Sequence, residues 1–234
     1  MLKRTNSFAA TLLLACALVA SACGGEDDNK ADGSTDSEGT GDYLPWTKGN
    51  TWTYRVTNNG EVSEKITTIE AEEEVGGDGP NKAKRAFKVV TRKGMSDETV
   101  SWQARDGDRV VRYREQSFHA GTGELELEEH WAPYKLHFDG TKEHTEEGAT
   151  YLESYSETKT YASGKPTEES EERDRWFVDS RSEKVTVPAG TFDAIVVQKA
   201  GGGDVKTYWY VRGVGKVKET GGQTEELVEY KVNP

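Results

Sequence analysis

Four histidines form the most suggestive metal-ligating pattern in this sequence, and the last three of them are seven residues apart. They are His119, His130, His137 and His144. Glu128 and Glu129 stand directly before the second histidine, and imidazole and carboxylate groups are common ligands of divalent metals such as zinc and copper. The pattern therefore raises the hypothesis of a divalent metal site.

The interval loses this meaning if the surrounding segments are strands, because neighbouring side chains on a strand point to opposite faces. In the segment 124–131, the apolar residues Leu127 and Trp131 share one face, which leaves His130 on the other. The same alternation turns His137 away from its apolar neighbours. We therefore expect both histidines to face solvent. The sequence also has no H-E-x-x-H motif and no paired cysteines, so we predict neither a metal site nor a cofactor.

Residues for covalent or acid–base catalysis do not occur in a recognisable arrangement. There is no G-x-S-x-G motif, and both cysteines lie within the first 23 residues, so none is available to the rest of the chain as a nucleophile. Runs of acids such as 72–74 and 168–169 are typical of solvated surfaces. The glycines at 201–203 lack the Lys-Ser/Thr and the helix of a phosphate-binding loop. We therefore predict that the protein is not an enzyme.

Aromatic residues are the second group that could make a site. The chain has six Trp, ten Tyr and six Phe, and each aromatic side chain buries a large area. If the sheet is curved, its concave face could bind a lipid-like ligand, because barrel mouths are common ligand sites. The residues that could line that face are Trp52, Tyr54, Trp102, Trp131, Trp176 and Trp209. They could instead be the core of a protein in which only 33% of residues are hydrophobic.

The elements that must position these side chains are strands, because a period of two runs through the sequence from residue 43 onward. In the segment 51–57, the residues Trp52, Tyr54 and Val56 fall on one face. The Asn-Asn-Gly at 58–60 then favours a tight hairpin, because Asn and Gly tolerate the positive φ that such a turn needs.

The same pattern recurs to the end of the chain. Further strands are expected at 62–69, 86–92, 98–104, 109–116, 124–131, 134–138, 151–161, 173–179, 183–187, 192–199, 206–212, 215–220 and 225–232. The run Ala-Ile-Val-Val at 194–197 is apolar on both faces and marks the strand expected to be most buried. The spacing predicts an all-β fold, in which an antiparallel meander forms a curved sheet or half-barrel.

The charge of the chain limits its partners. The formal net charge is −12, whereas binding to phosphate backbones requires a basic face. Nucleic acid is therefore not an expected partner. Electrostatic attraction to anionic lipid is disfavoured for the same reason, so attachment to a membrane would need a different cause.

The first 23 residues have the organisation of an export signal. Lys3 and Arg4 precede an apolar run at 8–20, which is shorter than the roughly 20 residues of a permanent membrane helix. The sequence Val19-Ala20-Ser21-Ala22-Cys23 then resembles the lipobox of bacterial lipoproteins. This resemblance implies cleavage before Cys23, a diacylglycerol on its sulfur and acylation of the new amine, with fatty acyl chains such as palmitate.

Two interpretations of this cleavage site remain open. The run Ala20-Ser21-Ala22 also fits an ordinary A-x-A signal cleavage site, which would release a soluble chain that begins with Cys23. In both cases Cys16 leaves with the signal, so the mature chain cannot form an intramolecular disulfide. The acidic segment 24–42 has no large apolar side chain and is expected to be a disordered tether.

Three motifs of the remaining chain occur in a suggestive order. They are Y-L-P-W-T-K-G-N-T-W-T-Y at 43–54, V-T-V-P-A-G-T-F at 185–192 and W-Y-V-R-G-V-G-K-V at 209–217. Together they are similar to a loose family of exported bacterial proteins of unknown function, over roughly residues 43–220. The resemblance implies a curved β half-barrel like those of the lipoprotein carriers LolA and LolB. It implies no catalytic residue.

The sequence thus predicts a signal peptide at 1–22, a lipidated Cys23 with an acidic linker at 23–42, and a single β domain at 43–234. We expect the lipid on Cys23 to hold the protein on the cell membrane or outer membrane, with the domain in the periplasm or at the cell surface. The expected role is non-enzymatic binding of a lipid-like ligand or an envelope protein. The alternatives are a structural or interaction module of the cell envelope without a small ligand and, less favoured, a metal-binding envelope protein.

Overall fold

Strands form wherever the period of two runs in the sequence. The computed structural model describes residues 42–94, 97–119 and 121–233. The predicted signal peptide, Cys23 and the predicted tether up to residue 41 lie outside the described residues. Within the described ranges, no helix is long and apolar enough to cross a membrane.

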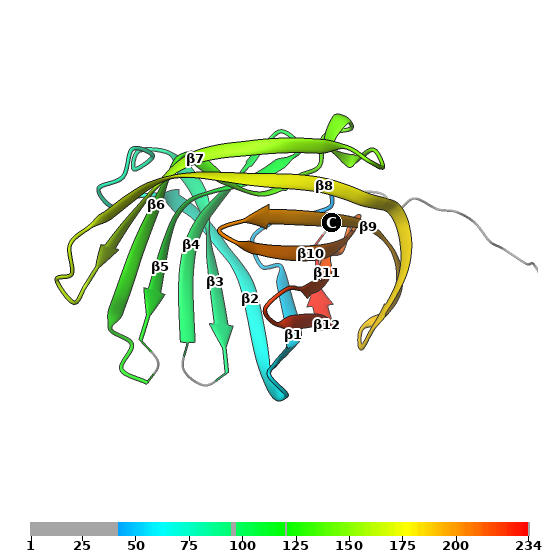
Figure 1. Cartoon of the computed structure of the whole chain (residues 1–234). Helices are drawn as coiled ribbons and strands as arrows, with labels where there is room; N and C mark the ends of the chain where they lie inside the picture. The colour runs from blue at the N-terminus through cyan, green and yellow to red at the C-terminus, as the bar shows by residue number, and fades with distance from the viewer. Residues whose placement is uncertain (1–41, 95–96, 120, 234) are drawn as a thin grey trace, which may run out of the picture. The chain divides into compact units, whose positions relative to one another are not determined.

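The described residues form twelve strands, which Figure 1 shows as one barrel, and one 3-10 turn, η1 at Glu143–Thr145. The strands are β1 Thr51–Asn58, β2 Glu61–Glu74, β3 Arg85–Lys93, β4 Asp97–Asp106, β5 Arg109–Phe118, β6 Leu125–Asp139, β7 Thr150–Tyr161, β8 Glu168–Val187, β9 Gly190–Gly201, β10 Asp204–Val211, β11 Gly215–Thr220 and β12 Thr224–Lys231. Each strand pairs antiparallel with the next one in the chain. The predicted all-β antiparallel meander is therefore confirmed.

The barrel is closed, which corrects the expected half-barrel. The last strand, β12, returns to pair with β1, so that Thr51 lies opposite Lys231 and Thr57 lies opposite Thr224. Closure satisfies the backbone groups that an open sheet would leave along its two edges. The alternation within each strand carries no information on whether the first and last strands meet, so closure was not predictable from that pattern.

Two local predictions hold in detail. The β1–β2 hairpin turns at Asn59 and Gly60, whose φ angles are 49° and 87°, and Asn58 pairs with Glu61 on either side of it. The run 194–197 in β9 has four consecutive buried side chains, none more than 1% exposed.

The segments expected at 124–131 and 134–138 are instead one continuous strand, β6, and those at 173–179 and 183–187 both belong to β8.

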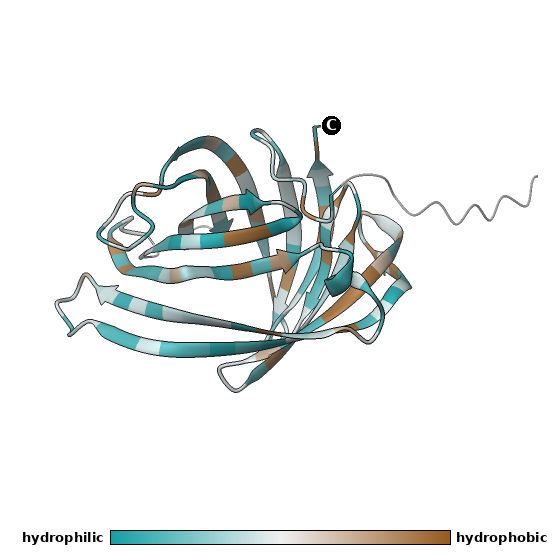
Figure 2. Cartoon of the chain, turned by 90° about the horizontal axis from the view of Figure 1, so that it is seen from above, coloured by the Kyte–Doolittle hydropathy of each residue, from teal (hydrophilic) through white to brown (hydrophobic). Residues whose placement is uncertain are grey.

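The core occupies the end of the barrel at which β1 begins. The segment 42–50 packs into this end, and its Trp46 ring lies 5.5 Å from the ring of Trp52. Asn50 holds the segment in place, because its side chain donates a hydrogen bond of 2.7 Å to the carbonyl of Pro45. In Figure 2, apolar residues (brown) alternate with polar ones (teal) along the strands, as a barrel with two different faces requires. We call this end of the barrel the closed end.

Phe138 in β6 tests how much the core at the closed end contributes to stability. Its side chain is 1% exposed and its ring contacts the rings of Tyr43 and Tyr210, at 5.3 and 4.3 Å between centroids. We expect Phe138→Ala to lower the free energy of unfolding by about 3–5 kcal/mol, because it leaves a cavity in the core.

Phe177→Ala is the matched control, because Phe177 in β8 is 36% exposed. Urea unfolding should show a loss of less than about 1 kcal/mol for this variant. Equal losses for the two variants would contradict this description of the core.

Candidate functional site

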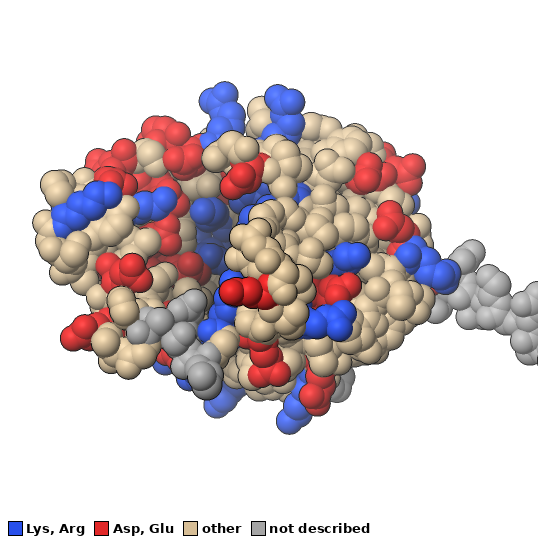
Figure 3. All heavy atoms as spheres, turned by 60° about the horizontal axis from the view of Figure 1, so that its bottom comes forward, with Lys and Arg blue, Asp and Glu red and all other residues tan. Residues whose placement is uncertain are grey.

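The barrel contains a cavity of about 580 Å³ at the end opposite the core. Its rim includes Gly201, Gly202 and Asp204 of the β9–β10 hairpin and Gln223 beside β12. Figure 3 shows the molecule hollowed on one face, with Lys and Arg atoms (blue) inside the hollow. We call this space the mouth cavity.

Charged side chains dominate the wall of the mouth cavity. Lys216 of β11 forms ion pairs with Glu219 and with Glu225, the latter at 2.8 Å. Glu225 also pairs with Lys65 of β2, and Glu219 with Lys206 at 3.2 Å. The side chains of Glu219 and Glu225 are 7% and 3% exposed, so these carboxylates are buried but fully engaged with ammonium groups.

The pKa values follow from this arrangement. Burial alone would lower the pKa of Lys216, but the carboxylates of Glu219 and Glu225 outweigh it and hold that pKa well above its ordinary value. Burial would raise the pKa of Glu225, but Lys216 and Lys65 hold it well below its ordinary value. Lys65 differs, because burial and the nearby charge of Lys216 lower its pKa to about 8. The network therefore depends on the ionised form of Glu225.

A second set of paired charges lies across the cavity on β6–β9. Asp174 of β8 forms an ion pair with Lys199 at 2.5 Å and accepts a hydrogen bond of 3.2 Å from the hydroxyl of Tyr155. Glu157 of β7 accepts from Lys159 at 2.7 Å and from the indole N–H of Trp131 at 2.8 Å. The wall thus presents carboxylates and ammonium groups that compensate each other, and not a continuous apolar surface.

A smaller space of about 200 Å³ adjoins the mouth cavity, deeper in the barrel. The two share four lining residues, Lys65, Arg112, His137 and Lys216. Most of the remaining wall carries hydroxyl, amide or aromatic side chains from β1–β4 and from the segment 42–50. We call this space the inner chamber.

His137 stands where the two spaces meet. Arg112 lies 3.4 Å away, between its Nη2 and the Nδ1 of the imidazole. Burial lowers the pKa of His137, and the charges of Arg112, Lys216, Lys199 and Lys65 lower it further. The imidazole is therefore neutral at neutral pH and can accept a hydrogen bond from the guanidinium.

The structure brings three of the six aromatic residues predicted to line a site to these cavities. Trp52 and Tyr54 line the inner chamber, and Trp176 lines the mouth cavity. The Trp52 indole donates a hydrogen bond of 2.6 Å to the carbonyl of Val214. The Tyr54 hydroxyl donates one of 3.0 Å to the carbonyl of Lys216. Both polar ends therefore bond to the barrel wall, and the rings remain as the surface of the chamber.

The other three lie elsewhere. Trp131 is 1% exposed and turns its indole N–H to Glu157 in the cavity wall without lining the cavity itself. Trp102 alternates with chamber residues of β4, so it lies on the outer face, where the guanidinium of Arg114 covers its ring at 4.3 Å. Trp209 also lies on the outer face, because its neighbours Tyr208 and Tyr210 line the mouth cavity. Its indole donates a hydrogen bond of 2.9 Å to Glu183.

The expected solvent exposure of the histidines is wrong for His130, which is 7% exposed. The connection between β2 and β3 covers it, and a Cβ on Gly79 there would lie 2.2 Å from the imidazole Nδ1. Asn81 fixes this connection, because its side chain donates hydrogen bonds of 2.7 Å to the carbonyl of Trp131 and of 2.9 Å to that of Pro133. His137 is also not on an outer face, because it lines both cavities.

The histidines have separate partners. His130 lies 2.8 Å from Glu128, and His144 lies 2.7 Å from Asp139 and stacks on Tyr151 at 3.9 Å. His119 is exposed at the end of β5. No group of three or more His, Cys, Asp or Glu side chains is arranged to hold a metal within the ranges that the structure describes.

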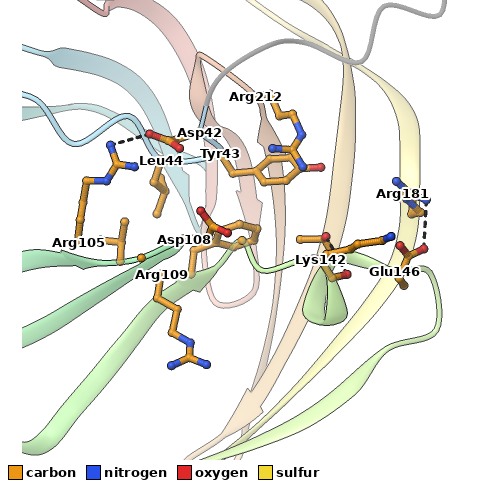
Figure 4. Close-up of a pocket in the computed structure, with 15 residues that line it drawn as sticks. Asp42, Tyr43, Leu44, Arg105, Asp108, Arg109, Lys142, Glu146, Arg181 and Arg212 are labelled. Carbon is orange, nitrogen blue, oxygen red and sulfur yellow. Dashed lines mark hydrogen bonds and ion pairs between the residues drawn. The ribbon is translucent and has the colours of Figure 1, made fainter.

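A third pocket, of about 380 Å³, lies at the closed end and is shown in Figure 4. Asp42 pairs with Arg105 at 2.7 Å, and Glu146 pairs with Arg181 at 3.1 Å. The guanidinium of Arg212 stacks on the ring of Tyr43 at 4.1 Å. The ion pair of Asp42 and the cation–π contact of Tyr43 tie the first described residues to the strand ends. The pocket therefore lies where segment 42–50 attaches to the barrel.

Sequence reasoning missed the charged wall, which is the main feature of the site. Lys65, Lys216 and Glu225 lie on strands that were expected at 62–69, 215–220 and 225–232, but no site was predicted at their charged positions. One usable signal was present in β10, where Lys206 shares its face with Tyr208 and Tyr210. An ammonium group among large aromatics on one face indicates that this face is not a purely apolar core, because a buried charge needs polar partners.

Glu225→Gln tests the importance of the ion network. Because the pKa of Glu225 is lower in the folded chain than its ordinary 4.5, its stabilising effect is complete above pH 4.5 and is lost as the pH falls toward the folded value. At about pH 7 we expect the variant to lose about 3 kcal/mol, because Lys65 and Lys216 lose their shared partner. Its stability should also vary less with pH in acid than that of the wild type.

Glu226→Gln is the control, since the neighbouring Glu226 pairs with an exposed Arg55 at 2.6 Å. It should lose less than about 1 kcal/mol, as measured by urea unfolding followed by tryptophan fluorescence. A similar loss in both variants would contradict a special role for the buried network.

Comparisons with known proteins give distant structural likenesses. No family model and no curated protein matches the sequence. A solved protein of Bacteroides fragilis, provisionally described as exported and with a YmcC-like fold, is 13% identical, with a TM-score of 0.46 over 82% of this chain and 100% of that one. A provisionally described lipoprotein of Parabacteroides distasonis is also 13% identical, with a TM-score of 0.39 over 82% of this chain and 99% of that one.

Proposed function

We propose that this chain is an exported bacterial lipoprotein, anchored through Cys23, whose barrel binds a small molecule without converting it. The observation that carries the proposal is the mouth cavity of about 580 Å³, which adjoins a deeper chamber of about 200 Å³. The volume of the mouth cavity is in the range of small-ligand sites. The lipobox at residues 19–23 supports the export and the anchor.

The wall of the cavity favours a polar or amphiphilic ligand over a purely apolar one. A lipid tail in this space would have to cover paired ions such as Lys199 with Asp174 and Lys216 with Glu225, which costs free energy because these groups would lose their remaining water. Trp176 and Tyr208 offer ring surfaces beside those ions. A small molecule with ionic or hydroxyl groups and one apolar face satisfies both parts of the wall.

The ion pairs also support binding without catalysis. A nucleophile or general base needs a side chain that an adjacent group activates and that can reach the substrate. In the mouth cavity, Lys65, Lys216 and Lys199 are each held by a carboxylate of the wall. Their charges therefore position and compensate one another, which suits a preorganised binding site.

The anchor is tested by the mass of the mature protein from a bacterial host. We expect the chain to begin at Cys23 and to carry a diacylglycerol and an N-acyl group, so that it fractionates with membranes. Cys23→Ser should abolish both the added mass and the membrane fraction. Cys16→Ser is the matched control and should change neither, because Cys16 leaves with the signal. An unmodified N-terminus at Cys23 in the wild type would exclude the anchor.

Ligand binding is tested by native mass spectrometry of the mature protein, followed by thermal-shift measurements with the small molecules found. Asp204 is at the rim of the mouth cavity, so we expect Asp204→Trp to obstruct it and weaken binding about tenfold or more. The neighbouring Val205 is 57% exposed, and Val205→Trp should leave affinity unchanged. If the protein retains no small molecule and none from a broad set binds, the barrel is an interaction module without a small ligand.

A further inference from the structure

The inner chamber differs from the mouth cavity in its chemistry. Its wall on β2–β4 carries short hydroxyl and amide side chains, among them Thr67, Thr99 and Gln103. Trp52 and Tyr54 contribute the rings of the opposite part. The chamber therefore offers hydrogen-bonding groups around a volume of about 200 Å³, which is enough for a small polar group but not for a large ligand.

Three of its lining residues have buried polar atoms without a hydrogen-bond partner. In the described part of the chain, five buried side-chain nitrogen or oxygen atoms lack such a partner, and three of them are Trp46 Nε1, Gln103 Oε1 and Arg112 Nε. Trp46 and Gln103 are only 5% and 2% exposed. Because buried polar groups in folded proteins are nearly always hydrogen-bonded, this clustering in one chamber indicates an occupant that supplies the missing partners.

The type of these atoms favours an occupant that accepts hydrogen bonds. Trp46 and Arg112 can only donate through their N–H groups, whereas Gln103 Oε1 can only accept. The guanidinium already donates to Glu115 at 2.7 Å, so its Nε is the group left over. Two donors and one acceptor suit an oxyanion with a neighbouring hydroxyl or amine.

The charge around the chamber favours the same occupant. Among the described residues, three cations line the chamber, namely Lys65, Arg112 and Lys216, and one carboxylate, Glu115. Glu225, which pairs with Lys65 and Lys216, lines the mouth cavity and not the chamber. The lowered pKa of His137, caused by burial and then by four surrounding cations, is a second indication of positive potential. An anionic group placed here would meet charge-assisted N–H donors, which are the stronger kind of hydrogen bond.

We infer that the inner chamber binds the oxyanion of a small organic acid, with Arg112, Lys65 and Trp46 as its donors and Gln103 as the acceptor for a neighbouring hydroxyl or amine. The inference rests on the proposed function, because it names the ligand class of the same barrel. The rest of the acid extends into the mouth cavity, where Trp176 and Tyr208 face it. Figure 3 shows the Lys and Arg atoms inside the hollow through which it enters.

A series of molecules with one shape and different charge tests this inference on the unaltered mature protein. Benzoate, benzamide and benzamidine are planar and of similar size, but they are anionic, neutral and cationic. Calorimetric titration at low ionic strength should show benzoate binding about tenfold or more tightly than benzamide, because only the anion forms charge-assisted bonds with the donors. Benzamidine should bind more weakly than benzamide. A parallel titration with inorganic phosphate shows whether the chamber prefers a phosphate or a carboxylate.

Variants then locate the anion. Arg112→Gln and Lys65→Met should each weaken benzoate binding about tenfold or more, because both residues line the inner chamber. Lys218→Met is the matched control, since Lys218 lines neither cavity and lies over the ring of Trp209 on the outer face. Lys206→Met distinguishes the two spaces, since Lys206 lines only the mouth cavity. Near-ultraviolet circular dichroism of each variant shows whether the barrel remains folded.

The outcomes separate the two proposals. Equal affinity for benzoate and benzamide, or a native ligand that has no anionic group, would overturn the anion site and leave a ligand-binding barrel in place. Loss of benzoate binding in Lys206→Met but not in Lys65→Met would place the anion in the mouth and also overturn the inference. Absence of any bound small molecule, native or added, would remove both proposals.

Discussion

The barrel encloses more interior than its apolar side chains can fill. Buried ion pairs occupy part of the remainder, and Glu225 is their central carboxylate. A twelve-stranded barrel is wide, whereas hydrophobic residues make up only 33% of the chain. Apolar side chains therefore fill the closed end, and the remaining interior is held by buried ion pairs. Glu225 holds Lys65 and Lys216 together, and these two ammonium groups come from strands on either side of the seam where β1 meets β12. A cavity with a charged wall is the direct consequence.

Strand existence and local turns could be predicted from the sequence because they depend on neighbours in the chain. The Asn59-Gly60 hairpin and the buried run 194–197 are examples. The face of each strand that points inward was harder to assign. Alternation separates two faces, but in β4 the polar Ser101 and Gln103 face the chamber whereas Trp102 packs outside. A rule that places large aromatics inside gives the correct face for Trp52 and Tyr54 and the opposite face for Trp102.

Features that join distant segments were beyond the reach of pattern reasoning. His130 is buried because Gly79, some fifty residues earlier in the chain, leaves room for its imidazole. Closure of the barrel and the meeting of Lys65 with Glu225 depend in the same way on the return of β12 to β1. The candidate site combines both problems, because its walls come from β1–β12 and its defining residues are polar. Its position follows only from the three-dimensional arrangement.

The seam between β1 and β12 also brings the C-terminal end of the described chain against Asn50, the residue that precedes β1. The backbone N–H of Asn233 donates 2.9 Å to Asn50 Oδ1, and the side-chain amide of Asn233 lies 3.0 Å from the same oxygen. A peptide linker could therefore join the C-terminal side of β12 to the segment before β1, and new ends could be opened at the Asn59-Gly60 turn of the β1–β2 hairpin. Because the strands close into a ring, the chain could begin at a different strand and still form the same barrel. Circular permutation could therefore place a reporter at the mouth and leave the wall residues in place.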